Sequence, residues 1–312
     1  MNTEIISYPN SDKLFNYLTN QSRSDHTDFS TYTQNEFSQY WLFSDIYNFF
    51  GPNITGQHRY IKNNLKNALT ASTPKNLDKG IPKSLLNSEN LFEAHVELIL
   101  NDYYINTPEG IKQKKNGLDA KLSRYAFWCI AKQHPNMIFT ELYLMNPTFT
   151  HDQVCFYAYH LSRIHLREKL SKLEKTINGI AYKHKIDLNA FHREQENVFF
   201  CDNNPKSIES FYRRKRELTG SILNHIGQHS LRARITALKN AINYYDSQKE
   251  VNFQKFYNFL LNELRTQRNK LYCQKNIFPS EEIYTFPITD LKKELKEQEK
   301  IFIRKFITLK LR

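Results

Sequence analysis

The chain has 312 residues, of which 40% are hydrophobic and 24% are charged, a composition that excludes a wholly disordered, collagen-like or linker protein. No run of about 18 apolar residues occurs, so no transmembrane helix is predicted. The first residues lack the features of a secretory signal peptide. The net charge of +12 is uneven: residues 1–150 carry 14 basic and 14 acidic side chains, whereas residues 151–312 carry 30 and 18. A basic half of this kind indicates nucleic acid or an anionic membrane surface as partner, with a passive surface as the alternative.

Residues 1–35 are polar and rich in Ser, Thr and Asn, which predicts a flexible arm with one short helix at Lys13–Leu18. Residues 36–148 are predicted to form a small α+β domain. Its aromatic segment 38–50 predicts a strand followed by a helix over Asp45–Phe50, with Ser44 as the cap.

Apolar residues at helical spacing predict three more helices in this half, over residues 58–70, 91–100 and 122–132. Residues 107–120 are polar, and three lysines crowd there between two glycines. We therefore predict an exposed basic loop over 107–120.

From His151 almost to the end the pattern is helical, which predicts a mainly helical domain over residues 150–312. Its first helix carries a heptad-like stripe, favouring packing within the chain over a dimer helix: Leu166, Leu170, Leu173, Ile177 and Ile180. Further helices are predicted over 205–218, 219–245 and 251–274, and from Thr289 onward. The apolar and basic tail 301–312 alternates, so a strand or a membrane-surface segment is an alternative there.

Motifs for metal, cofactor or nucleophile chemistry are not evident. The four cysteines form no CxxC pair and have no adjacent His or Lys, which predicts reduced thiols in a cytosolic protein. His225 and His229 have the spacing of zinc ligands on a helix, but no Glu follows the first, and Gly227 interrupts them. We therefore expect no metal and no cofactor. Whether the protein is an enzyme is uncertain, and a non-enzymatic protein is favoured.

The strongest charge cluster is Arg213–Arg216, four consecutive cations, with Arg232 and Arg234 close behind. Lysine and arginine clusters bind phosphates by releasing counterions, and arginine forks onto phosphate oxygens. Phe211 and Tyr212 precede the run, and an exposed ring there would stack on an unpaired base. The pattern favours a nucleic-acid site, with a solvated helix face as the alternative.

Several segments also resemble known families. YWLFSDIYNFF (40–50), HRYIKNNLKNAL (58–69) and LSRYAFWCIAK (122–132) resemble the BRO N-terminal domain (BRO-N). LREKLSKLEKTINGI (166–180), SILNHIGQHSLRARIT (221–236), ELR (263–265), PSEEI (279–283) and DLKK (290–293) resemble, in the same order, the bacterial DNA-damage-inducible protein D family. The region after Gly227 departs from that family's pattern. The resemblance implies a BRO-N-like first domain and a DNA-linked role in the damage (SOS) response. It maps Lys121 and Arg124 onto the LSRYA helix, where Arg124 either contacts DNA or braces the domain.

We therefore expect a non-enzymatic, cytoplasmic and nucleoid-associated DNA-binding protein of the bacterial damage response. Single-stranded DNA or a recombinase–DNA filament is the preferred partner. The expected contacts are Lys62, Lys66, Lys121, Arg124, Arg213, Arg214, Lys215, Arg216, Arg232 and Arg234. The alternative is an adaptor, antirepressor or exported effector whose basic face binds an acidic protein, and a metal-dependent nuclease ranks third. The sequence leaves the oligomeric state and export without a signal peptide open.

Overall fold

The protein has an α+β fold, as predicted, with a small antiparallel sheet in its first half and helices in its second. The computed structural model describes residues 10–21, 23–24, 39–56, 58–73, 86–107, 109–134, 137–201, 204–248, 252–284 and 287–310. Most of the predicted arm, residues 1–35, lies outside these ranges. The predicted arm helix is present as α1 (Ser11–Asn20).

The chain divides into two compact units. We call residues 1–158 with 295–312 the sheet unit and residues 159–294 the helical unit. The sequence instead suggested a boundary near residue 149 and assigned the whole C-terminal segment to the helical domain. The last helix accounts for the difference, because Phe302 and Phe306 pack on Trp128 and Tyr125 of the sheet unit, with ring centroids 5.2 and 6.2 Å apart.

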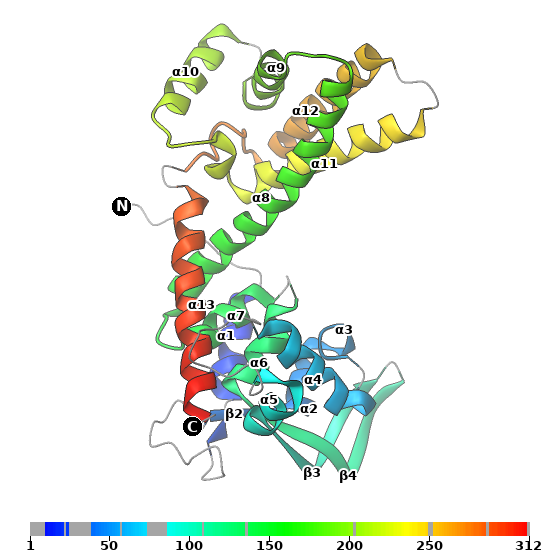
Figure 1. Cartoon of the computed structure of the whole chain (residues 1–312), viewed down its shortest axis with the longest axis vertical. Coiled ribbons are helices and arrows are strands. Elements are labelled where there is room, and N and C mark those ends of the chain that lie inside the picture. The colour runs from blue at the N-terminus through cyan, green and yellow to red at the C-terminus, as the bar shows by residue number, and fades with distance from the viewer. Residues whose placement is uncertain are drawn as a thin grey trace. The chain divides into compact units, whose positions relative to one another are not determined.

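The sheet is antiparallel, with the strand order β1-β2-β4-β3. Its strands are β1 (Arg23–Ser24), β2 (Gln39–Leu42), β3 (Val96–Thr107) and β4 (Gly110–Ser123). β3 and β4 pair along their length, but β2 pairs with β4 only at residues 121–123. Beyond β2, the other two strands extend as a two-stranded ribbon (Figure 1). We call residues 98–107 and 110–120 the β3–β4 ribbon.

The remaining elements of the first half surround a central buried helix. They are α2 (Phe43–Phe50), α3 (Pro52–Thr55), η2 (His58–Tyr60), α4 (Ile61–Ser72), α5 (Ser88–His95), α6 (Arg124–Lys132) and α7 (Ile138–Met145). Every residue of α6 from Arg124 to Ala131 is buried, and the Ser123 hydroxyl caps the helix by accepting a hydrogen bond from the Ala126 N–H at 3.2 Å. α6 therefore forms the centre of this unit's core, with α4 and α7 packed against it.

Three local predictions in this unit were wrong. The helix predicted over 91–100 ends at His95, where β3 begins, and the basic loop predicted over 107–120 is strand β4. Pairing between residues distant in sequence overrides local pattern here. Ser44 is not the cap of α2, which begins at Phe43; its hydroxyl instead donates to Asp119 Oδ2 at 2.6 Å.

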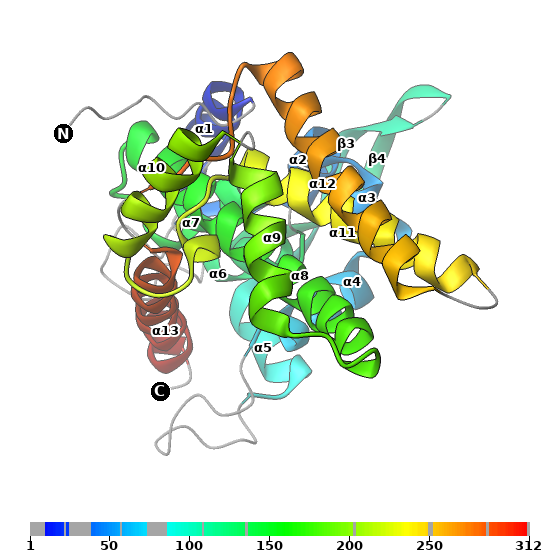
Figure 2. The same ribbon diagram turned by 90° about the horizontal axis from the view of Figure 1, so that it is seen from above.

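The second half is helical, as predicted. Its helices are α8 (His151–Lys183), α9 (Leu188–Phe200), α10 (Pro205–Arg216), η5 (Ile222–Asn224), α11 (Gln228–Ser247), α12 (Phe253–Lys275) and α13 (Ile288–Lys310). α11 and α12 lie side by side, and α10 lies on the opposite side of the helical unit from α11 (Figures 1 and 2). The alternating tail belongs to α13, so the strand alternative was wrong.

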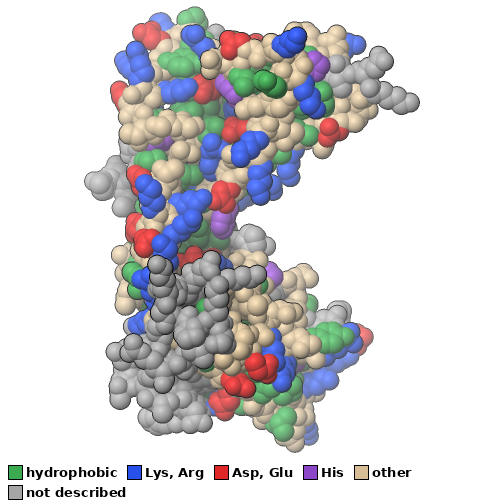
Figure 3. Space-filling model, viewed as in Figure 1, with side chains coloured by type: hydrophobic (Ala, Val, Ile, Leu, Met, Phe, Trp, Pro, Cys, Tyr) green, Lys and Arg blue, Asp and Glu red, His purple; other side chains and the backbone are tan. Residues whose placement is uncertain are grey.

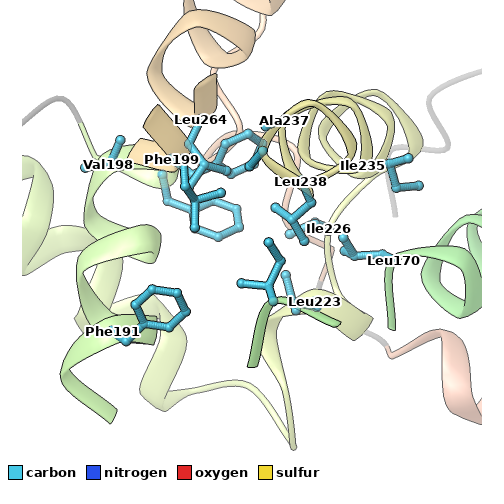
Figure 4. Packing of buried hydrophobic residues seen from close by; sticks show 14 of the residues in the cluster. Leu170, Phe191, Val198, Phe199, Leu223, Ile226, Ile235, Ala237, Leu238 and Leu264 are labelled. Atoms are coloured by element: carbon cyan, nitrogen blue, oxygen red, sulfur yellow. The ribbon is translucent and has the colours of Figure 1, made fainter. Parts of the chain in front are cut away.

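The helical unit has one large apolar core (Figure 4). Leu170 and Ile177 of α8 are fully buried in it, with Ile235 and Leu238 of α11. This confirms that the leucine stripe packs within the chain. Residues between the stripe positions, such as Lys172 and Lys175, are exposed to solvent.

A buried polar network anchors the start of α11. Arg163 is fully buried; its Nε donates to the Ile226 carbonyl at 3.0 Å, and its Nη1 donates to His160 Nδ1 at 2.8 Å. Glu282 accepts hydrogen bonds from the Ser230 N–H and hydroxyl, at 2.7 and 2.6 Å. A carboxylate at a helix N-terminus satisfies backbone donors and complements the helix dipole.

Candidate nucleic-acid interface

The four cations of α10 do not act together. Arg214 donates to the carbonyls of Ser280 and Ile283, at 3.2 and 2.6 Å, and Lys215 lies 2.5 Å from a carboxylate oxygen of Glu196. Arg213 and Arg216 are exposed, three residues apart on the helix. Of the run, these two side chains are therefore the ones placed to meet a phosphate.

The aromatic pair before this run does not form a stacking platform. Phe211 is buried and stacks on Phe200, with centroids 5.0 Å apart. Tyr212 is half-buried, and its hydroxyl donates to Asn197 Oδ1 at 2.9 Å. Packing of α10 against α9 therefore occupies both rings, contrary to the prediction of an exposed ring.

Arg232 and Arg234 point in different directions on α11. Arg232 is exposed, whereas Arg234 is 2% exposed and pairs with Glu174 of α8 at 3.6 Å. Burial lowers the pKa of Arg234, and Glu174 opposes that shift. A buried guanidinium cannot reach a phosphate, so Arg234 is not part of the interface.

In the sheet unit, most of the expected contacts have partners within the fold. Lys66 pairs with Glu89, and Lys121 lies 3.5 Å from Glu97. Arg124 is 3% exposed and donates to the Gln39 side chain, which agrees with bracing of the domain rather than DNA contact. Lys62 is exposed and forms no ion pair with any residue that the structure describes.

The structure exposes a lysine face on α8 that was not predicted from the sequence. Its members are Lys169, Lys172, Lys175 and Lys183. All four are exposed, and none pairs with a carboxylate among the described residues. At about 100° per residue the four span about 120° of the helix surface, with Lys175 opposite the leucine stripe and Lys169 beside it. The leucine stripe could have indicated these residues, since the positions of a helix outside its apolar stripe are the ones exposed to solvent.

The lysine face continues onto α11. Gln228 Oε1 accepts from Ser162 of α8 and from Arg232, both at 3.4 Å, which places Arg232 beside α8. Lys239 is exposed two turns further along α11. Figure 3 shows Lys and Arg side chains gathered over α8 and α11. We call these residues the α8–α11 basic face: Lys169, Lys172, Lys175, Lys183, Arg232 and Lys239.

Internal pairing explains why this face is strongly positive. The helical unit carries 24 basic and 15 acidic side chains, a net charge of +9. Several of its carboxylates are already used inside the unit: Glu168 pairs with Lys292, Glu174 with Arg167 and Arg234, and Glu196 with Lys215. The exposed lysines therefore lack neutralising neighbours in the described part of the unit.

A nucleophile or metal site is not assembled from the described residues. Cys155 contradicts the expectation of isolated thiols, because His151 lies one turn before it. Its Sγ is 3.9 and 3.7 Å from the two ring nitrogens, so it lies on the lone-pair axis of neither, and the thiol is buried.

His225 precedes α11 rather than sharing its face with His229. Its two ring nitrogens face the carbonyls of Tyr284 and Thr219, at 3.0 and 2.9 Å. No three His, Cys, Asp or Glu side chains of the described ranges are placed to hold a metal ion.

Comparison with known proteins gives no match: no family model, curated protein or solved structure is similar to this chain. Among the described helices, none combines the length and the apolar character needed to cross a bilayer.

Proposed function

We propose that the protein is a non-enzymatic DNA-binding protein that holds the phosphate backbone on the α8–α11 basic face. The observation that carries this proposal is the row of exposed lysines on α8 whose potential carboxylate partners are paired elsewhere. Lys169 and Lys183 are 14 residues apart, which is about 21 Å along a helix. That length matches about six phosphates of one strand of a DNA duplex.

Single-stranded DNA remains the preferred partner in this proposal, for a different reason than the sequence suggested. Tyr182 is 78% exposed and directly precedes Lys183 on the same helix. An exposed ring beside a cation suits stacking on an unpaired base. The resemblance to the DNA-damage-inducible protein D family supports a role in the bacterial damage response, in the cytoplasm at the nucleoid.

The test is fluorescence anisotropy of labelled single- and double-stranded oligonucleotides over a salt series. Each phosphate contact contributes to the slope of log affinity against log salt, by about −0.7 for single strands. Replacing Lys169, Lys172 and Lys175 with Gln should therefore weaken binding and make the slope shallower by about 2. Tyr182→Ala should weaken single-strand binding about fivefold or more and leave duplex binding nearly unchanged.

The matched control replaces Lys255, Lys270 and Lys275 of α12 with Gln, which removes the same charge from three exposed positions. We expect this variant to keep the slope of the unchanged protein. Equal losses in both triple variants would mean that only net charge matters and would reject the α8–α11 basic face. Absence of binding at about 0.05 M salt would reject DNA binding and favour the adaptor alternative.

A further inference from the structure

One face of the β3–β4 ribbon is apolar and open to solvent. Five large apolar side chains lie on it: Leu98, Leu100, Tyr104, Ile111 and Leu118. Strand register places them on the same face, because Leu98, Leu100, Tyr104 and Asn106 alternate along β3, and Leu118 and Ile111 lie opposite Leu100 and Asn106. Leu100 and Ile111 are 72% and 73% exposed. Asp102 lies on the same face between Leu100 and Tyr104, so the continuous apolar part is Leu98, Leu100 and Leu118. Exposed apolar surface of this kind marks a protein–protein contact.

The opposite face of the ribbon is already covered. Tyr103 and Ile105 are buried there, and the Tyr103 hydroxyl faces His58 Nδ1 at 3.3 Å. α2 contacts both strands. The uncovered face therefore belongs to a ribbon whose other side is fixed by its own unit.

The outer edge of the ribbon is closed at one end only. β3 is the last strand of the sheet. Asn48 of α2 closes part of its edge, donating to the Tyr104 carbonyl at 2.6 Å and accepting from the Asn106 N–H at 3.0 Å. Outward-pointing residues alternate along an antiparallel strand, so the backbone of Leu98 and Leu100 also points outward. No described residue forms a hydrogen bond to this outward backbone.

The two edges of the ribbon differ in their protection against pairing. β4 carries Lys112, Lys114 and Lys115, all exposed, and a bulge at Asn116, which has φ 46°. Lysines and bulges are the devices by which sheets block pairing with another strand. On β3 the segment Leu98–Asn101 (LILN) has no charge at all. The ribbon is therefore protected along β4 and unprotected along this part of β3.

We propose that the segment Leu98–Asn101 of β3 pairs antiparallel with the same segment of a second copy of this chain, forming a two-fold symmetric dimer. Pairing centred on Ile99 places Leu98 opposite Leu100 of the second copy, and Leu100 opposite Leu98. Glu97 then faces Asn101, so no like charges oppose one another. The uncharged segment complements itself in this register, whereas it offers nothing to the phosphates of a nucleic acid. On the exposed face, Leu98 of one copy then packs beside Leu100 of the other, which covers part of both side chains.

The first test is the mass of the full chain in solution by sedimentation and light scattering over a concentration series. We expect the unchanged protein to shift toward twice its 37.2 kDa mass as concentration rises. Leu100→Lys should raise the dimer dissociation constant at least tenfold. Ile111→Lys is the matched control, because Ile111 is equally exposed on the same face but lies on the protected strand; we expect it to keep the dimer.

A second variant separates backbone pairing from apolar contact. Leu100→Pro removes an N–H that points away from β4, so the ladder within the chain is retained while pairing with a second copy is blocked. Circular dichroism checks that each variant is folded. A monomer at all concentrations would overturn the proposal. Equal weakening by Leu100→Lys and Ile111→Lys, with no effect of Leu100→Pro, would overturn edge pairing.

Register is tested by cross-linking. In the proposed dimer Ile99 faces its own copy in a non-hydrogen-bonded pair, where Cα atoms are about 4.5 Å apart, within the range that a disulfide spans. Ile99→Cys, in a chain with the exposed Cys273 changed to Ser, should form a covalent dimer under mild oxidation. Glu97→Cys in the same chain should not, and the reverse result would overturn this register.

Discussion

The α8–α11 basic face and the β3–β4 ribbon are both exposed, yet they present opposite chemistry. On α8 the lysines remain unpaired because carboxylates such as Glu174 are bound to buried or half-buried arginines. On the ribbon the apolar side chains remain exposed because only the opposite face is covered by the unit's own helices. The difference teaches that what a surface can bind depends on which groups the interior has already used. A charged surface results in one unit and an apolar surface in the other.

The largest expected effect concerns Arg163, a buried arginine of the helical unit. Replacing Arg163 with Leu leaves the carbonyl of Ile226 without its donor and removes the partner of His160. We expect the helical unit to lose about 3 kcal/mol of unfolding free energy. Both tryptophans, Trp41 and Trp128, belong to the sheet unit. Urea unfolding followed by circular dichroism should therefore shift strongly while tryptophan fluorescence shifts little.

The control for this variant is Arg216→Leu in the same unit. Arg216 is exposed on α10, so its loss should change stability by about 0.5 kcal/mol or less. Similar losses for the two arginines would show that burial of Arg163 does not organise the helical unit, and would remove the contrast between interior and surface arginines.

Long helices were predictable from the sequence, whereas the ribbon was not. The stripe from Leu166 to Ile180 repeats at helical spacing, and the intramolecular packing that it indicated is present. β3 shows no simple alternation of apolar and polar residues, because Leu98 and Leu100 are apolar on its exposed face. Its strand character depends on pairing with β4, which local pattern does not contain.

The candidate interface was predictable only in part, for a similar reason. The run Arg213–Arg216 is evident in sequence, but Arg214 and Lys215 are engaged by residues 69 and 19 positions away. Arg234 is buried and pairs with Glu174, which lies 60 residues earlier. The α8 lysines form no run of charge in the sequence, because they are interleaved with apolar and acidic residues. Accessibility of a charge is therefore a tertiary property.

A smaller effect comes from pH and should have opposite signs in the two units. Burial, together with Arg163, lowers the pKa of His160 to about 3 from 6.5. The unfolded chain therefore binds a proton at His160 more readily than the folded protein does. The helical unit should therefore lose stability as pH falls from 6.5 toward 3, by about 1 kcal/mol per pH unit. Burial raises the pKa of Glu141 to about 7 from 4.5. Here the folded state binds the proton more readily, so the sheet unit should lose stability as pH rises from 4.5 to 7.

The measurement is urea unfolding between pH 5 and pH 7, read by circular dichroism for the helical unit and by tryptophan fluorescence for the sheet unit. His160→Gln should flatten the first profile and Glu141→Gln the second. If the stability of both units changed in the same direction with pH, the opposite effects assigned to His160 and Glu141 would be wrong.

The smallest effect concerns the Asn48 side chain, which closes the β3 edge next to the open segment. Asn48→Ala removes the hydrogen bonds to Tyr104 and Asn106 and should cost the sheet unit about 1 kcal/mol. In the proposed register, residues 104 and 106 would face residues 94 and 92 of the second copy, which belong to α5 and not to a strand. The same variant should therefore weaken the monomer and leave the dimer dissociation constant unchanged. Asn67→Ala, at an exposed position of α4, should change neither. If Asn48→Ala strengthened dimerisation as well as lowering stability, the freed backbone at Tyr104 and Asn106 would be pairing with the second copy. The register centred on Ile99 would then be wrong, because it places no strand opposite those residues.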